Sequence, residues 1–351
     1  MRIVLLLAGL AIVSALSYYR LAEKTPEPPG RPFSLSGETM GTTYSIKLVA
    51  QPRAGLSYWE FQVFQITLQA MLALVDDRMS TYKPDSELSR FNAWASSEPF
   101  EISQQMATVM SAALEVSDQS AGAFDITVGP IVNAYGFGPE ERTAPPDEEE
   151  LAALRERVGY EMLTMDPTVP AISKARPDIY CDLSAIAKGY AADVMAQMLE
   201  WRRITDYFIE IGGEVRARGR NERGDIWTVG IEKPLEKGRA VHRAVPLEDF
   251  AMATSGDYRN YYEENGTRIS HTIDARTGRP ITHNLASVTV FHEQCMMADA
   301  YATAIMVLGP EDGYLMAKIL NLPVLFLVRG PGGTFSERST PAFEERFGAA
   351  R

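Results

Sequence analysis

The spacing of apolar residues predicts several long helices in this chain. Apolar side chains recur every three or four positions over residues 59–79 and again over 102–119, as in helices with one buried face. Residues 297–309 are apolar almost all round, which predicts a helix buried on all sides. A further helix is expected to begin after the turn at 182–184 and to extend to about Arg203.

Shorter apolar runs predict strands. Residues 34–49 alternate weakly and are expected to form a turn followed by a half-buried strand, and 178–181, 207–215 and 227–234 predict further strands. Residues 269–280 predict a strand that leads into a turn, whereas the polar segment around 253–259 predicts a turn. Because these elements follow no regular βαβ rhythm, we expect an α+β fold of mixed, largely antiparallel sheets with packed helices, in two closely associated lobes with a ligand cleft between them.

The N-terminal segment has the pattern of an export signal. One arginine precedes the apolar run 3–16, so residues 1–20 are expected to be a signal peptide or a signal-anchor. The run is short for a membrane-spanning helix, which needs about 20 apolar residues. Residues 21–33 are rich in proline and predict a tether, followed by a folded body over 34–345. The acidic, proline-rich stretch at 138–150 is the best candidate for a boundary between lobes.

Charge and cysteine content exclude some classes of function. The chain of 351 residues has 34 Lys and Arg against 46 Asp and Glu, a formal net charge of −12, and no basic cluster stands out. A nucleic-acid partner would need a positive patch, so none is expected. The two cysteines, Cys181 and Cys295, are too few for a Cys-based metal site. An oxidising compartment would allow a disulfide between them, but two buried free thiols are favoured.

The stretch 181–193 joins a predicted strand end to a predicted helix through a polar turn. Asp182 and Ser184 occupy positions typical of helix N-caps. The start of a helix presents unpaired backbone N–H groups and a partial positive charge, which phosphates commonly occupy. The turn is therefore either a phosphate-binding element or simply the start of a capped helix.

Asp299 and Thr303 form a candidate metal site in the apolar helix at 297–309. They are four residues apart, so their oxygens project from the same helix face. A carboxylate in so apolar a helix is costly unless it is paired or binds a cation, and such oxygen ligands suit Mg²⁺. The alternative is an aspartate that interacts with the helix dipole and a threonine that bonds its own turn.

Two further segments are candidates for ligand contact. Residues 122–138 combine several glycines, an acid and aromatic residues, which is typical either of backbone held close to a ligand or of an ordinary turn. His271 is the histidine set among several polar neighbours, so it is a candidate for chemistry as well as for a plain strand position.

A set of short motifs occurs in one order along the chain and resembles the bacterial ApbE-type FAD:protein FMN transferases. The resemblance runs from about residue 40 to 309, nearly the whole folded body. It rests on Met-Gly-Thr-Thr-Tyr at 40–44, Met-Ser-Thr-Tyr at 79–82, Ser-Glu-Leu-Ser-Arg-Phe-Asn at 86–92, Gly-Ala-Phe-Asp-Ile-Thr-Val-Gly-Pro at 122–130, Asp-Leu-Ser-Ala-Ile-Ala-Lys-Gly-Tyr at 182–190, Ile-Gly-Gly-Glu at 211–214, Ser-Gly-Asp-Tyr at 255–258, His-Thr-Ile-Asp at 271–274 and Ala-Asp-Ala-Tyr-Ala-Thr at 298–303.

The resemblance implies an activity: FAD is split at its pyrophosphate, FMN is joined to a threonine of a target protein, and AMP leaves. It implies Mg²⁺ as cofactor, FAD as substrate and, as partner, a threonine-containing electron-transfer protein at the membrane. By position, the residues implied to contact FAD are Met40, Tyr82, Ala123, Phe124, Asp125, Asp182, Lys188, His271 and Ile273. The implied Mg²⁺ ligands are Asp299, Thr303 and the backbone carbonyl of Ala185, with Ala302 beside them, and His271 and Asp299 are the implied catalytic residues.

Two other functions fit the same motifs. Water in place of threonine would make the protein an FAD pyrophosphatase, and loss of turnover would leave an exported FAD-binding protein. A pure binder has little use for a metal site, so the Asp299 and Thr303 pair favours an enzyme. The resemblance also implies a location at the periplasmic face of the bacterial inner membrane, although the lipoprotein cysteine that often follows the signal in this family is absent.

Overall fold

The computed structural model describes residues 30–50, 56–139, 142, 144–235, 238–258, 261–264 and 267–348. The predicted export signal and most of the predicted tether lie outside these residues. The predicted tether ends at residue 33, but a strand already begins at Arg31, because residues 31–33 pair with a neighbouring strand. Among the residues described, no helix combines the length and apolar character needed to cross a membrane.

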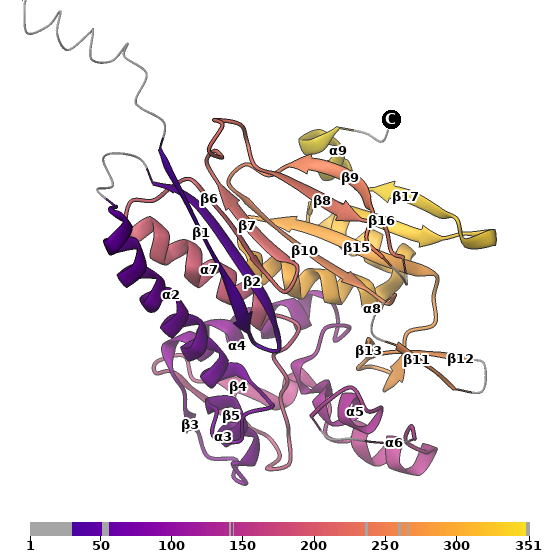
Figure 1. Ribbon diagram of the computed structural model, residues 1–351. Coiled ribbons are helices and arrows are strands. Elements are labelled where there is room, and N and C mark those ends of the chain that lie inside the picture. The colour runs from indigo at the N-terminus through magenta and orange to yellow at the C-terminus, as the bar shows by residue number, and fades with distance from the viewer. Residues whose placement is uncertain are drawn as a thin grey trace, which may run out of the picture.

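An eight-stranded antiparallel sheet organises the molecule, which confirms the predicted α+β class (Figure 1). Its strands run in the order β1-β2-β6-β7-β10-β15-β16-β17. Their bounds are β1 (Arg31–Thr39), β2 (Thr42–Ala50), β6 (Tyr207–Ile211), β7 (Glu214–Arg218), β10 (Phe250–Gly256), β15 (Leu285–His292), β16 (Val324–Arg329) and β17 (Phe335–Ser339).

Smaller sheets surround the large one. They are built from β3 (Phe100–Glu101), β5 (Ala171–Lys174) and β4 (Leu163–Met165); from β8 (Thr228–Glu232) and β9 (Val241–Pro246); from β11 (Tyr261–Glu264) and β12 (Thr267–Ser270); and from β13 (Ile273–Asp274) and β14 (Arg279–Pro280). The strand predicted at 227–234 is confirmed as β8, whereas the one predicted at 269–280 is divided between β12, β13 and β14.

Two layers of helices cover one face of the large sheet. α7 packs on β6 and β7, α8 packs on β10 and β15, and α2 and α4 cover α7 and α8 in turn. The helices and 3₁₀ turns are α2 (Tyr58–Met79), α3 (Glu87–Ala93), α4 (Gln104–Gln119), η2 (Ile126–Val128), α5 (Gly129–Ala134), α6 (Glu148–Arg155), η3 (Tyr160–Met162), α7 (Ala187–Trp201), α8 (Cys295–Ile319), η4 (Pro331–Gly333) and α9 (Pro341–Phe347).

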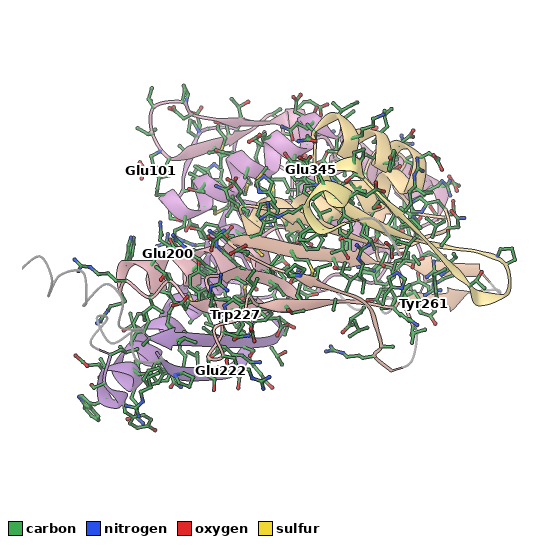
Figure 2. All side chains as sticks on the ribbon, turned by 90° about the horizontal axis from the view of Figure 1, so that it is seen from above. Glu101, Glu200, Glu222, Trp227, Tyr261 and Glu345 are labelled. Atoms are coloured by element: carbon green, nitrogen blue, oxygen red, sulfur yellow. The ribbon has the colours of Figure 1, made fainter. Side chains whose placement is uncertain are left out.

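Side chains on alternate strand positions build a core on each face of the sheet. Ala251 and Ala253 of β10 pack into the core shared with the helices, whereas Met252 between them packs with the β8–β9 hairpin and α9. This is the alternation expected for a strand buried on both faces. Figure 2 shows the molecule from above, with the described side chains drawn on both faces of the sheet.

The predicted helices are confirmed, and their ends have clear physical causes. α2 begins with a capping box, in which the Ser57 hydroxyl accepts from the Glu60 N–H and the Glu60 carboxylate accepts from the Ser57 N–H. In α8 the backbone leaves helical geometry at Gly309, where φ is 82°, and a second helical segment starts at Pro310. The helix predicted to end at residue 309 therefore ends there, and the next segment follows at a kink.

Two segments predicted to contain one strand each are hairpins. The turn and strand predicted within 34–49 are present, but a second strand precedes the turn. Residues 34–49 belong to β1 and β2, joined by Met40 and Gly41, which both have positive φ as a tight two-residue turn requires. Residues 207–215 form most of β6 and β7, and the glycines at 212 and 213 make the turn between them, again with positive φ. Paired glycines in an apolar run therefore mark a reversal of the chain.

Two other local predictions are wrong. Residues 178–181 are outside every sheet, because the side-chain amide of Asn92 replaces a neighbouring strand: it donates to the Cys181 carbonyl and accepts from the Cys181 N–H, both at 2.8 Å. Residues 253–256 lie in β10 rather than in a turn, since their polar side chains line a cavity at the end of a central strand.

Both cysteines are buried and free, as favoured by the sequence. Burial raises the pKa of each thiol above its ordinary value, because a thiolate would lose its hydration. Neither thiol is therefore set up as a nucleophile.

Candidate functional site

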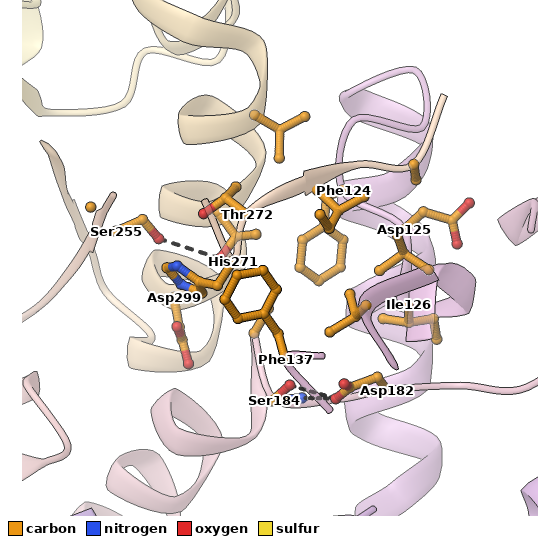
Figure 3. A pocket seen from close by; sticks show the side chains of 18 of the residues that line it. Phe124, Asp125, Ile126, Phe137, Asp182, Ser184, Ser255, His271, Thr272 and Asp299 are labelled. Atoms are coloured by element: carbon orange, nitrogen blue, oxygen red, sulfur yellow. Dashed lines mark hydrogen bonds between the residues drawn. The ribbon is translucent and has the colours of Figure 1, made fainter. Parts of the chain in front are cut away.

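A cavity of about 820 Å³ collects nearly all of the predicted site residues (Figure 3). Its walls come from the 123–137 segment, the 182–188 turn, the β6–β7 turn, the end of β10, the 271–275 segment and α8. The predicted residues that line it are Tyr82, Ala123, Phe124, Asp125, Asp182, Ala185, Lys188, His271, Ile273, Asp299 and Thr303. Segments more than 200 residues apart in the sequence, from Tyr82 to Thr303, therefore meet at one site.

Two of the predicted residues are not part of the cavity lining. Met40 lies in the β1–β2 turn and packs partly buried against the main core. Ala302 is buried on α8 with 1% of its surface exposed, on the side turned toward the core. Its neighbours Asp299 and Thr303, one helical turn apart, are the residues that reach the cavity.

The turn at 182–186 is not the helix cap that the sequence predicted. The Asp182 carboxylate accepts from the N–H of Ser184 at 2.8 Å and from its hydroxyl, so it closes a local turn. α7 begins five residues later at Ala187, and its N-cap position, Ile186, provides no side-chain hydrogen bond. The first turn of α7 is consequently open to a partner from elsewhere in the fold.

That partner comes from α8. Asp299 Oδ2 accepts from the Gly189 N–H at 3.1 Å and thus caps the first turn of α7. The approach requires glycine, because a Cβ at residue 189 would overlap the backbone of Cys295 and Met296. Asp193 of α7 makes the reciprocal contact with α8: its carboxylate accepts from the N–H groups of Cys295 and Met296 at 3.0 and 2.9 Å. Each helix therefore caps the other.

Lys188 lies between two buried carboxylates at the base of the cavity. Its Nζ is 3.2 Å from Glu214 Oε1 and 3.7 Å from Asp299 Oδ2. Burial alone would lower the pKa of Lys188, but the negative charges of Asp299 and Glu214 outweigh it and hold that pKa above its ordinary value. Burial raises the pKa of both carboxylates, although Lys188 opposes the shift.

This cluster fits an additional cation. With both acids ionised it carries one negative charge in excess, and Glu214 Oε2 is buried without a hydrogen-bond partner. The Thr303 hydroxyl is 3.4 Å from that of Ser255, and both residues line the cavity together with Ala185 and Asp299. Among the described residues, no group of three or more His, Cys, Asp or Glu side chains is arranged to hold a metal by itself. One carboxylate with neutral oxygens is, however, a donor set that Mg²⁺ accepts when substrate phosphates complete it.

The opposite wall is fixed by the Asp125 carboxylate. Its Oδ1 accepts from the Thr127 N–H and hydroxyl, and its Oδ2 accepts from the Tyr160 N–H at 2.8 Å. Burial raises the pKa of Asp125, and these hydrogen bonds partly offset the shift. The same loop accepts a hydrogen bond through the Ile126 carbonyl from the Asp182 N–H. Asp125 therefore holds the loop in place, and the adjoining Ala123 and Phe124 form the apolar surface.

Aromatic side chains line the outer part of the cavity. Phe137 packs edge-on against His271 at 6.2 Å between ring centroids and lies beside Tyr262 at 5.5 Å. Figure 3 shows His271 and Asp299 on the α8 side, with Phe124 and Ile126 across the cavity. An apolar, aromatic slot next to a polar base suits a ligand with a flat ring at one end and charged groups at the other.

Sequence reasoning missed three residues of the site. Glu214 and Ser255 line the cavity and lie within two of the ordered motifs, but the motifs alone give neither a role. A glutamate directly after a glycine turn inside a buried hairpin is the available signal for Glu214. No local sequence pattern indicates the role of Asp193, because its hydrogen-bond partners are about 100 residues away in the sequence.

Comparison with known proteins gives a consistent result. The model of the ApbE family matches residues 40–326. An FAD:protein FMN transferase of Vibrio cholerae is 46% identical over 319 residues, covering 91% of this chain and 93% of that protein. One from Escherichia coli is 37% identical over 341 residues, covering 95% of each.

Solved structures of similar proteins share the fold. The flavin transferase ApbE from Vibrio cholerae superposes with a TM-score of 0.83 at 44% identity, covering 91% of this chain and all of that one. The flavinyl transferase ApbE of Pseudomonas stutzeri, in its apo form, gives the same TM-score at 36% identity, covering 93% and 100%.

Proposed function

The chain belongs to the ApbE family and is an FAD:protein FMN transferase, and from this premise we propose that it moves FMN onto a threonine hydroxyl with the help of Mg²⁺. The observation that carries the proposal is the cavity itself. It joins an aromatic slot to a buried Lys188, Glu214 and Asp299 cluster, which matches the two ends of a flavin dinucleotide.

The proposed reaction exchanges the pyrophosphate bond of FAD for a phosphoester bond to threonine. The threonine oxygen attacks the phosphorus of the FMN half of FAD, and a Thr–O–P bond forms. The P–O bond to the adenylate breaks, and AMP leaves with the electron pair. The hydroxyl proton passes to a nearby base, and His271 on the cavity wall is the residue we assign to receive it.

The chain's own groups prepare this step. Lys188 is held charged by its two carboxylates, so it offers a fixed positive charge to the pyrophosphate. Phe124 and Phe137 exclude water from the flavin end. Asp299, Thr303 and the carbonyl of Ala185 would hold Mg²⁺, which when bound supplies further stabilisation of negative charge on the phosphates.

We also propose where the protein works. The apolar run at 3–16 and the proline-rich segment after it support export to the periplasmic face of the inner membrane, with a membrane-associated electron-transfer protein as the acceptor of FMN. These features support the location independently of the chemistry.

Mass spectrometry of the acceptor tests the proposed reaction. The full-length protein is mixed with FAD, Mg²⁺ and a target domain that carries the acceptor threonine. We expect an FMN-sized mass increase on that threonine and release of AMP. Free FMN and AMP without an adduct would favour the FAD pyrophosphatase, and unchanged FAD would favour a binding protein.

The metal assignment makes a sharper prediction. Asp299→Ala should abolish Mg²⁺-dependent turnover, because it removes the only carboxylate among the proposed ligands. Asp312→Ala, at an exposed aspartate on the same helix, is the matched control and should keep full activity. Retained activity of Asp299→Ala at ordinary Mg²⁺ concentrations would contradict the assignment of Asp299 as a Mg²⁺ ligand.

A further inference from the structure

α2 is apolar on two opposite faces, only one of which is buried. Its inner face packs Phe61, Phe64 and Leu68 into the core. Trp59, Val63 and Ile66 recur at helical spacing on the outer face, and Trp59 and Ile66 expose 72% and 67% of their surface. A second apolar stripe of this kind is unusual on a surface helix, where the outer face is normally polar.

The C-terminal end of α7 exposes a further aromatic side chain at the same end of the molecule. The Arg202 guanidinium lies 5.1 Å from the centre of the Phe64 ring, which places the end of α7 beside the first turns of α2. The preceding residue, Trp201, is 74% exposed. Exposed tryptophans on two adjacent helices, with Tyr58 at the tip of α2, therefore lie at one end of the molecule. We call Tyr58, Trp59, Val63, Ile66 and Trp201 the aromatic face.

Basic residues border the aromatic face. Arg202 and Arg203 are both exposed at the end of α7. Arg31 lies over the Phe33 ring, which stacks on Phe61 of α2 at 4.4 Å between centroids. Glu60 is the acid nearest the tip of α2, and it is engaged in the capping box. Three exposed arginines therefore lie at this end of a protein with a net charge of −12.

The first described residues of the chain lie at this same end of the molecule. The described chain begins at Gly30, directly before Arg31, and 29 residues with an apolar run at 3–16 precede it in the sequence. Figure 1 shows the start of β1 and the first turn of α2 at the same end of the molecule. A segment entering a membrane from here would bring the aromatic face to the membrane surface.

We propose that the aromatic face is a membrane-docking surface, which rests on an anionic lipid bilayer. Tryptophan and tyrosine favour the boundary between headgroups and acyl chains, and arginine favours anionic headgroups. A protein partner or a second copy of this chain would also cover apolar side chains. The bordering arginines and the adjoining apolar N-terminal segment favour lipid.

The cavity lies at the far end of the β1–β2 hairpin from the aromatic face. In this hairpin Arg31 pairs with Ala50 at the aromatic end, and Thr39 pairs with Thr42 at the other. Thr42 and the Lys188 side chain both lie next to Gly212 at the cavity. Nine residues of strand span about 30 Å, so docking of the aromatic face would leave the cavity free to bind an acceptor domain.

Tryptophan fluorescence tests the proposal on the full-length protein. Residues 1–29 contain no tryptophan, so the signal comes from residues 59, 94, 201 and 227. The protein is reconstituted in phosphatidylethanolamine and phosphatidylglycerol vesicles with brominated acyl chains, which quench fluorophores at the membrane boundary. We expect quenching in the wild type and in Trp94→Phe, and loss of it in Trp59→Phe/Trp201→Phe and in Val63→Asp/Ile66→Asp.

Each outcome of the quenching experiment either supports the docking surface or overturns it. Quenching that survives in both double variants, or no quenching of the wild type, would overturn the proposal. A concentration-dependent dimer that Val63→Asp/Ile66→Asp abolishes, without lipid quenching, would assign the face to a second copy and also overturn it. The proposal rests on the proposed membrane location. Since quenching requires no flavin chemistry, its failure and a failure of FMN transfer are distinguishable.

Discussion

At the residue scale, the positive charge of Lys188 depends on two neighbouring carboxylates. Partial burial by itself would lower the pKa of the Lys188 ammonium, because desolvation disfavours its charged form. Glu214 at 3.2 Å and Asp299 at 3.7 Å supply the compensation. Glu214 is the closer partner, so it leaves Asp299 available for other contacts. We infer that Glu214 is a positioning residue, which acts through Lys188.

A substitution at Glu214 tests that role. Glu214→Gln should leave Lys188 paired with Asp299 alone, so that the ammonium competes with Mg²⁺ for that carboxylate. We expect the Mg²⁺ concentration for half-maximal transfer to rise about tenfold, which is about 1.4 kcal/mol, with a smaller change in the rate at saturating Mg²⁺. Magnesium titrations of turnover measure both quantities.

Glu210 on β6 provides the control for this change. It lies in the same hairpin and accepts a hydrogen bond from the Gly213 N–H at 2.9 Å, but it does not line the cavity. Glu210→Gln should leave the Mg²⁺ dependence unchanged. Equal effects of the two substitutions would mean that the hairpin, and not the charge of Glu214, is responsible.

At the scale of elements, α7 and α8 depend on each other for their first turns. Neither helix has a side-chain cap of its own. Asp299 of α8 caps α7, and Asp193 of α7 caps α8 while it pairs with Arg216 at 2.7 Å. Because Asp299 is also a proposed metal ligand, the contact that orders these helices positions the site as well.

Loss of the Asp193 cap should destabilise the fold. Asp193→Ala leaves two backbone N–H groups of α8 without their acceptor and removes the carboxylate partner of Arg216, which keeps its hydrogen bond to the Glu293 carbonyl. We expect the free energy of unfolding to fall by about 2–3 kcal/mol, measured by urea denaturation. The exposed neighbour Glu293 is the control, and Glu293→Ala should change stability by less than about 0.5 kcal/mol.

The kink in α8 makes stability sensitive to pH. His283 packs on Gly309, where a Cβ would lie 2.7 Å from the His283 ring. Burial lowers the pKa of His283 below its ordinary value of 6.5, although the carbonyls of Met306 and Val307 oppose the shift. Between that lowered pKa and about 6.5, the unfolded chain binds a proton that the folded chain does not.

The contribution of His283 to the stability should therefore decrease as the pH falls below about 6.5 and level off below the lowered pKa. The contribution of His283 has a slope of at most about 1.4 kcal/mol per pH unit. Burial lowers the pKa of His292 as well, so His283→Gln should reduce this slope without removing it. Urea denaturation at several pH values checks the prediction, and an unchanged slope in His283→Gln would contradict it.

At the scale of the whole molecule, the cavity joins segments from both ends of the folded body. Tyr82 and the 123–137 segment come from one side, and the ends of β10 and α8 come from the other. A ligand that bridges them stabilises the folded state only. We therefore expect FAD to raise the unfolding free energy by about 2.7 kcal/mol at a free concentration of 100 times its Kd. Thermal unfolding with and without FAD measures this, and no shift would contradict binding in the cavity.

The sequence by itself determined the fold class, the long helices and most of the predicted residues that line the cavity. Apolar periodicity is a local property, so α2 and α4 could be predicted to within two residues at their ends. The motifs identified these cavity residues because each motif is short and continuous in the sequence. Asp299 and Thr303 could be recognised as a pair because they are four residues apart in one predicted helix.

Only the tertiary structure decided which groups act on one another. The pairing of Lys188 with Glu214, the mutual capping of α7 and α8, and the Asn92 side chain that replaces a strand beside Cys181 all join residues far apart in sequence. The predicted Asp182 cap was wrong for the same reason. A local pattern shows that a helix needs a cap, but the lowest-energy partner for its N–H groups came from another helix.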